Sequence, residues 1–149
     1  MLTIRSVEIR FAFYKEIEDV PGTYQVDEYE TVLLDRETEK GKSFIDEHLS
    51  DDTLLSDIRW GGCLWDACPR EDTDDVDEID IVWWHFDEDG KPYADFMSYG
   101  PDFTQCRVFC DAGHTDVFDI KDPTEDKTVK NLKSVVVTAV DDLRALTNS

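Results

Sequence analysis

Residues 79–99 read IDIVWWHFDEDGKPYADFMSY, and this stretch decides the fold. Its first eight residues are almost continuously apolar or aromatic, which is typical of a β-strand. Residues 87–91 place Asp and Gly where tight turns favour them, so we predict that residues 93–99 return as the second strand of a hairpin. Because side chains alternate along a strand, Trp83 and Trp84 should face opposite sides of the sheet.

Further elements are predicted on both sides of this hairpin. Alternating apolar residues favour strands over residues 2–14, 29–35, 104–110 and 115–120. We expect a turn or loop at 37–41, then one or two short helices over 43–60 with Ser50 as an N-cap. Residues 122–125, Asp-Pro-Thr-Glu, predict the start of a long C-terminal helix. The expected fold is α+β, with a mostly antiparallel sheet of about 5–7 strands and this helix packed on one face, in a single domain spanning residues 1–149.

Charge is the second informative feature of the chain. It has 36 Asp and Glu against 15 Lys and Arg, a formal net charge of -21 over 149 residues. Acidic chains with few aromatic residues are usually disordered, but this one is 40% hydrophobic and should fold. A surface this negative would repel nucleic acid and anionic membranes, and the expected partner is therefore a basic protein. The composition does not determine the oligomeric state.

The cellular location follows from what the sequence lacks. It contains no signal-peptide pattern at the N-terminus and no stretch of about 20 apolar residues that would span a membrane. We expect a cytoplasmic protein, located in the bacterial host cell if a phage or plasmid encodes it.

The acidic run before the aromatic strand is the first candidate site. Carboxylates can take the place of phosphates opposite Lys and Arg, so this run, the adjacent tryptophans and the acidic turn form a candidate partner-binding surface. The alternatives are a solvated loop that aids solubility and a calcium loop, but residues 72–83 lack the Gly and Glu of an EF-hand. The candidate residues are Glu71, Asp72, Asp74, Asp75, Asp77, Glu78, Asp80, Trp83, Trp84, Asp87, Glu88 and Asp89.

The aromatic strand itself has two interpretations. A central strand buried on both faces would carry Trp83 and Trp84 only as core residues. Alternatively, one face supplies an aromatic anchor for a partner, since Trp is enriched at binding hot spots.

Four cysteines and one histidine suggest a metal site that we do not favour. A zinc site would use Cys63, Cys68, Cys106, Cys110 and His114. Cys106 and Cys110 would lie on one face of a strand about 13 Å apart, too far for two ligands of one metal. Reduced thiols are therefore favoured, and we expect no metal and no cofactor.

No catalytic motif is recognisable, so we expect that the protein is not an enzyme. In its size, acidity and lack of catalytic motifs the chain resembles two groups that bind basic protein sites: anti-defence proteins that mimic DNA, and immunity proteins that neutralise nuclease toxins. The first hypothesis is accordingly a DNA or RNA mimic that inhibits a restriction enzyme or CRISPR effector. The alternatives are an immunity protein with a cognate nuclease toxin, and a housekeeping or halophilic protein whose acidity serves solubility.

Overall fold

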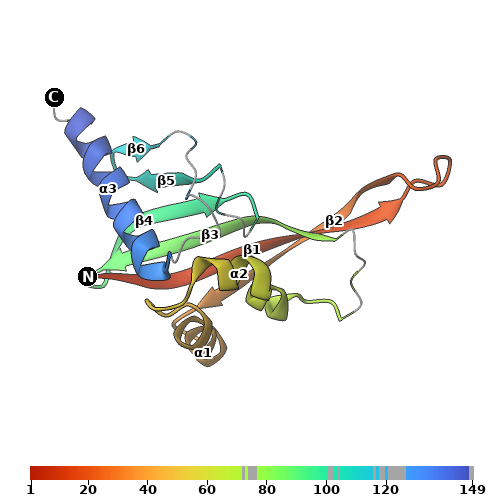
Figure 1. Ribbon diagram of the computed structural model, residues 1–149, viewed down its shortest axis with the longest axis horizontal. Helices are drawn as coiled ribbons and strands as arrows, with labels where there is room; N and C mark the ends of the chain where they lie inside the picture. Colours follow the sequence, from red (N-terminus) through yellow and green to blue (C-terminus); the bar gives the residue numbers. More distant parts are fainter. Residues whose placement is uncertain are drawn as a thin grey trace.

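A computed structural model describes residues 1–71, 73, 77–100, 103, 105–115, 117, 120 and 127–147, with the backbone alone described at 59–61. These residues form one antiparallel sheet in the strand order β2-β1-β3-β4-β5-β6 (Figure 1). The predicted α+β class and C-terminal helix are confirmed. The elements are β1 (Leu2–Glu16), β2 (Tyr24–Asp35), α1 (Glu39–His48), α2 (Leu55–Gly61), the 3-10 helix η1 (Cys63–Ala67), β3 (Glu78–Glu88), β4 (Lys91–Ser98), β5 (Arg107–Cys110), β6 (Gly113–His114) and α3 (Val129–Thr147).

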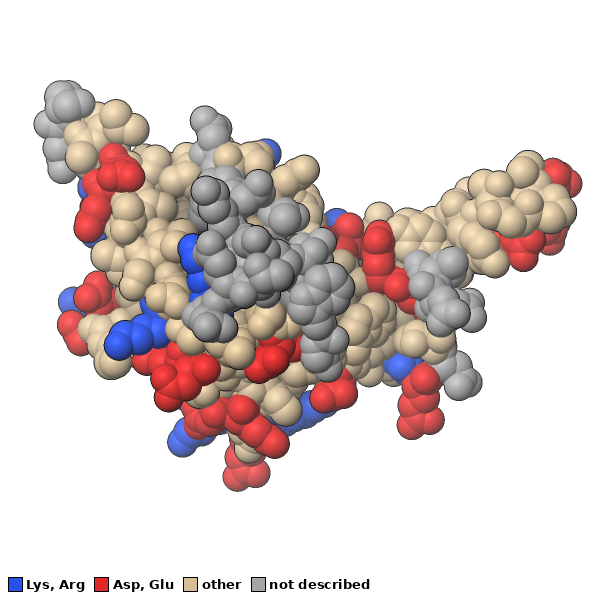
Figure 2. Space-filling model, in the orientation of Figure 1, with Lys and Arg blue, Asp and Glu red and all other residues tan. Residues whose placement is uncertain are grey.

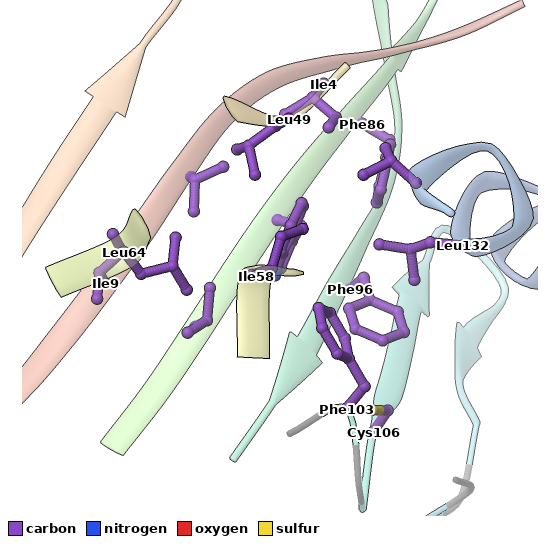
Figure 3. Close-up of a cluster of buried hydrophobic side chains, with 14 of the residues drawn as sticks. Ile4, Ile9, Leu49, Ile58, Leu64, Phe86, Phe96, Phe103, Cys106 and Leu132 are labelled. Atoms are coloured by element: carbon purple, nitrogen blue, oxygen red, sulfur yellow. The ribbon is translucent and has the colours of Figure 1, made fainter. Parts of the chain in front are cut away.

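One face of the sheet forms the hydrophobic core. Val7, Trp84, Phe96 and Val108 are successive register neighbours across β1, β3, β4 and β5, and all are fully buried. The buried side chains of α1, α2, η1 and α3 belong to the same core cluster, shown in part in Figure 3. The helices of the described chain therefore pack on this face and leave the opposite face uncovered.

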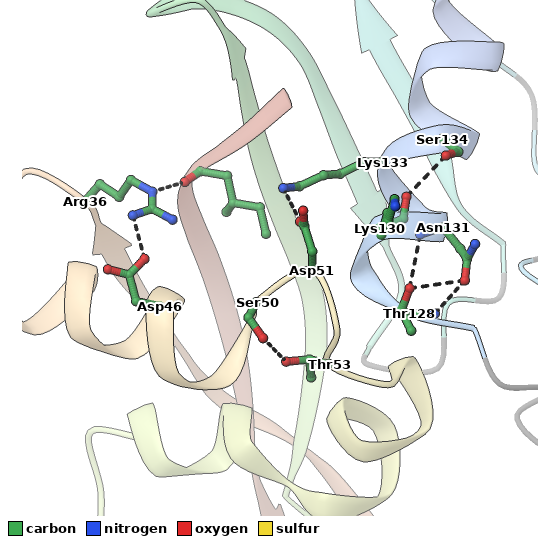
Figure 4. A network of polar contacts seen from close by, with 11 residues as sticks. Arg36, Asp46, Ser50, Asp51, Thr53, Thr128, Lys130, Asn131, Lys133 and Ser134 are labelled. Carbon is green, nitrogen blue, oxygen red and sulfur yellow. Dashed lines mark hydrogen bonds and ion pairs between the residues drawn. The ribbon is translucent and has the colours of Figure 1, made fainter. Parts of the chain in front are cut away.

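Polar contacts join α3 to the segment between α1 and α2 (Figure 4). Lys133 Nζ lies 2.5 Å from Asp51 Oδ1, and the Val129 amide donates to the carbonyl of Thr53 at 2.9 Å. Leu54 forms an isolated β-bridge with Thr128. These contacts hold two distant segments together on the helix side of the sheet.

A two-stranded arm, residues 13–28, projects from the body (Figure 1). β1 pairs with β3 only as far as Ala12, whereas its pairing with β2 continues to Glu16. An isolated hairpin is marginally stable, so contacts at its base matter. Arg70 supplies them: its guanidinium lies 3.9 Å from the ring centroid of Phe13 and pairs with Glu28.

The structure corrects two predictions about the first helices. The segment 37–41 is not only a loop, because α1 begins at Glu39, after Thr38 Oγ1 accepts a hydrogen bond from the Gly41 amide. Ser50 is not the N-cap of α2; Leu54 precedes that helix and makes no side-chain capping bond. Ser50 instead hydrogen-bonds Thr53 through the two hydroxyl groups at 3.0 Å.

Two predictions near the C-terminus also change. β5 pairs with the two-residue strand β6, and the described residues of the expected strand at 115–120 lie outside any strand. Residues 122–125, the predicted helix start, lie outside the described residues, and α3 has its first residue at Val129. None of the described helices is long and apolar enough to cross a membrane.

Candidate functional site: the uncovered sheet face

The acidic residues at the start of β3 are used inside the molecule. Asp77 Oδ1 accepts a hydrogen bond from the Tyr14 amide at 3.1 Å, and Glu78 accepts one from the Tyr14 hydroxyl. The bond to Glu78, with burial and neighbouring charge, raises the pKa of Tyr14 to about 12. Asp80 pairs with Arg10. These acids therefore attach β3 to β1 at the base of the arm.

The remaining predicted acids before β3 are only partly placed. Glu71 is exposed, next to Arg70. Asp72, Asp74 and Asp75 lie outside the described residues, and their predicted role stays a prediction.

The second acidic group lies at the other end of β3. Asp87 and Glu88 end the strand, and Asp89 occupies the tight turn with a φ of 52°. Glu88 and Asp89 are exposed, and Asp87 is half-buried. An extended strand rises about 3.3 Å per residue, so Asp77 and Asp87 lie about 33 Å apart.

The two tryptophans lie on opposite faces, as predicted, and only one is accessible. Trp84 is fully buried in the core, with its ring centroid 5.9 Å from that of Phe103. It cannot contact a partner in the folded protein, so its predicted binding role is wrong. Trp83 is half-buried on the uncovered face, 5.4 Å from Phe109 between ring centroids. The alternative of a strand buried on both faces holds for one face only, because Trp83 and His85 on the other face are half-buried.

We call this uncovered side of the sheet the open face. Its side chains form two rows because register partners share a face. The first row crosses β2 to β5, and the second crosses β2 to β6. The rows are Leu33, Glu8, Trp83, Met97 and Arg107, and Asp35, Ser6, His85, Asp95, Phe109 and His114.

His85 lies in the middle of the open face between two carboxylates. Its Nδ1 is 2.8 Å from Asp95 Oδ1 on β4, and its Nε2 is 3.5 Å from Glu8 Oε1 on β1. The hydrogen bond with Asp95, together with the charges of Asp95 and Glu8, raises the pKa of His85 against the opposing effect of burial. Nε2 is buried and has no hydrogen-bond partner among the described residues.

A shallow pocket of about 260 Å³ lies over this histidine. Its charged lining consists of Glu8, Asp35, Asp87, Asp95, Arg5 and His85. The sequence interpretation included only Asp87 among these. The others come from four strands, and their proximity depends on long-range pairing.

Acidic residues also extend beyond the open face. Figure 2 shows them along the lower edge of the molecule and at the end of the arm. The arm carries Glu16, Glu18 and Asp19 near its tip, with Val20 half-exposed beside them.

The four cysteines of the alternative zinc site form no disulfide. Cys106 is buried in the core, whereas His114 is exposed on the open face. Among the described residues, no three His, Cys, Asp or Glu side chains come together as metal ligands. Burial is the main cause that raises the pKa of Cys63 to about 11, so this thiol is protonated at neutral pH.

The chain matches no known protein-family model, no curated protein and no solved structure.

Proposed function

We propose that this protein is an acidic inhibitor that binds the basic, nucleic-acid-binding surface of a partner protein through its open face. The observation that carries the proposal is an uncovered sheet face with a half-buried tryptophan in the middle and carboxylates at both ends of its central strand β3. The partner classes that fit are a restriction enzyme or a CRISPR effector in the bacterial cytoplasm. In this role the protein would need no catalysis and no cofactor.

The spacing of the acidic groups supports mimicry of nucleic acid. Each strand of duplex DNA carries one phosphate per about 3.4 Å of helix axis. A β-strand rises about 3.3 Å per residue, so the 33 Å between Asp77 and Asp87 spans about ten phosphates. Both ends are partly engaged within the protein, because Asp77 accepts a hydrogen bond from the Tyr14 amide and Glu88 Oε1 lies 3.8 Å from the N-terminal ammonium of Met1. Asp89, in the turn, is exposed.

The whole-molecule charge supports the same partner. A net charge of -21 speeds the approach of a basic surface and makes association strongly dependent on salt. Trp83 offers the apolar contact that electrostatics alone lacks, because aromatic residues surrounded by polar groups commonly form binding hot spots.

A charge-matched pair of variants tests the proposal. The first combines Asp87→Asn, Glu88→Gln and Asp89→Asn at the turn between β3 and β4, beside the open face. The control combines Glu47→Gln, Asp141→Asn and Asp142→Asn on the exposed sides of α1 and α3. Both remove three negative charges, so a general effect of net charge would weaken binding equally.

Binding is measured on a partner isolated from host lysate on the immobilised protein and identified by mass spectrometry. We expect the turn variant to lose at least about tenfold in affinity and the control less than about threefold. Equal losses in the two variants would contradict binding through the open face. A partner without nucleic-acid-binding activity would contradict mimicry.

A second candidate, an immunity protein for a nuclease toxin, is favoured by the position of Trp83. Specific inhibitors depend on buried aromatic anchors more than on summed charge. For such a protein Trp83→Ala would weaken binding more than the triple turn variant. The opposite order supports mimicry.

A further inference from the structure

The pocket over His85 has an excess of negative charge on a face that no described helix covers. Four carboxylates and Arg5 line it, so three negative charges are in excess when His85 is neutral and two when it is protonated. The carboxylates come from four different strands: Asp35 from β2, Glu8 from β1, Asp87 from β3 and Asp95 from β4. The surface therefore complements a cationic group on a docking partner.

The spread of the carboxylates determines which cation fits. Neighbouring strands lie about 4.8 Å apart, so Asp35 on β2 and Asp95 on β4 are separated by about 14 Å. A metal ion would need its ligands within about 2.5 Å, and no such group occurs in the described chain. A planar guanidinium has five N–H donors and can bridge separate carboxylates, whereas an ammonium group is a compact point charge.

His85 lies between the two carboxylates, Asp95 and Glu8, that such a cation would contact. Protonated His85 presents one ring N–H to Asp95 and the other toward Glu8, two of the acids that line the pocket. At 3.5 Å from Glu8 Oε1, Nε2 makes no hydrogen bond, so Glu8 can accept another donor. Leu33, which is 53% exposed at the pocket wall, gives the aliphatic stem of a long side chain a surface to pack on.

We infer that this pocket binds an arginine side chain of the partner, and that the protonated imidazole of His85 competes with that arginine for Glu8 and Asp95. The inference rests on the proposed function only in assigning the arginine to the partner's nucleic-acid-binding surface. Its consequence is a docking site whose affinity for arginine depends on the protonation of His85.

The sign of the pH dependence follows from competition between two cations. Asp95 and Glu8 contact His85 and favour its protonated form, and Asp35, Asp87 and Arg5 are the other charged groups that line the same pocket. Arginine binding adds positive charge beside the imidazole and therefore lowers the pKa of His85. By linkage, arginine binds more tightly as the pH rises through that pKa.

The test is an NMR titration of the full-length 15N-labelled protein with N-acetyl-L-arginine amide. N-acetyl-L-citrulline amide, which has nearly the same shape without the charge, is the matched control ligand. We expect the arginine compound to shift the amides of Leu33 and Asp95 with a Kd of about 1 mM, and the citrulline compound to leave them in place. Binding should be about fivefold tighter above the pKa of His85 than below it, the size of one surface ion pair.

Two variants and one direct measurement complete the design. His85→Gln should bind arginine with little pH dependence, and Glu8→Gln with Asp95→Asn should lose at least about fivefold in affinity. Glu47→Gln with Asp142→Asn should bind as wild type does. The pKa of His85, followed by its ring resonances, should fall when arginine is added. This measurement uses the wild-type protein and does not depend on the folding of any variant.

Equal responses to arginine and citrulline, or a His85 pKa that does not fall, would overturn the inference. These outcomes are independent of any partner. If a nucleic-acid-binding partner is found but arginine does not bind the pocket, this inference alone fails. If arginine binds but the partner ignores nucleic acid, the proposed function fails and the pocket stands.

Discussion

Replacing Trp84 should mainly lower the stability of the protein, whereas replacing Trp83 should mainly weaken partner binding. Trp84 is fully buried among the core residues, and its ring lies 5.9 Å from that of Phe103. Truncating a buried Trp to Ala typically costs about 3–5 kcal/mol of unfolding free energy, because the transfer energy is lost and a cavity remains. For a domain of this size, such a loss lowers Tm by about 10 °C.

Truncating Trp83 to Ala should lower the free energy of unfolding by less than truncating Trp84. Trp83 is half-buried, so about half of its burial energy is at stake, together with its ring contact with Phe109 at 5.4 Å. Trp83→Ala should therefore lose about 1–2 kcal/mol. Since the open face is the proposed docking surface, this variant should nevertheless weaken partner binding while Trp84→Phe should not.

The assay is urea and thermal unfolding followed by circular dichroism, with each variant's heteronuclear NMR spectrum as a check on the native fold. Trp84→Phe is the matched control, because it keeps most of the ring volume and removes an indole N–H that has no acceptor among the described residues. If Trp83→Ala and Trp84→Ala lose equal stability, the assignment of the two sheet faces is refuted.

Three further changes test other parts of the structure. Folding raises the pKa of His85, so its protonation stabilises the folded protein below about pH 6.5, and this contribution is lost as the pH rises through the folded-state pKa. The urea unfolding midpoint of His85→Gln should therefore be lower than that of wild type at low pH and converge on it as the pH rises. A Cβ at Gly41 would overlap the backbone of Asp35, so Gly41→Ala should cost about 1–3 kcal/mol in urea unfolding, against less than about 0.5 kcal/mol for Lys42→Ala. Arg70→Ala should accelerate hydrogen exchange in the arm without changing exchange in β4, and unchanged arm exchange would show that Arg70 does not anchor it.

The strongest local sequence pattern, the apolar strand followed by a turn, correctly predicted the β3–β4 hairpin. The turn at 87–91 specified the β3–β4 hairpin, and the alternation along it correctly separated Trp83 from Trp84. The turn register alone would place His85 opposite Ala94, and a β-bulge between Phe86 and Asp87 shifts the pairing by one residue to Asp95.

The sequence did not predict the starts of α1 and α2 correctly, because tertiary and capping contacts determine where these helices begin. α1 begins at Glu39 because Thr38 caps it and Gly41 permits close approach to the end of β2, neither of which produces apolar periodicity. Ser50 had the residue type of an N-cap, but its hydroxyl hydrogen-bonds Thr53 instead.

The pocket over His85 could not be predicted from spacing along the chain. Glu8 reaches His85 only because β1 inserts between β2 and β3 in the sheet, a choice that no local sequence pattern specifies. Composition likewise predicts a basic partner, but it does not show that the described helices leave one sheet face uncovered.

The most direct test of the proposed function is competition for nucleic acid. The captured partner is bound to a fluorescent DNA or RNA duplex, and the protein is titrated in at low salt and at high salt. We predict that the protein displaces the duplex with a midpoint that rises steeply with salt, and that excess duplex in turn releases the protein. A partner that binds the protein and the duplex simultaneously, with neither weakening the other, would contradict the proposal that the open face occupies a nucleic-acid-binding surface.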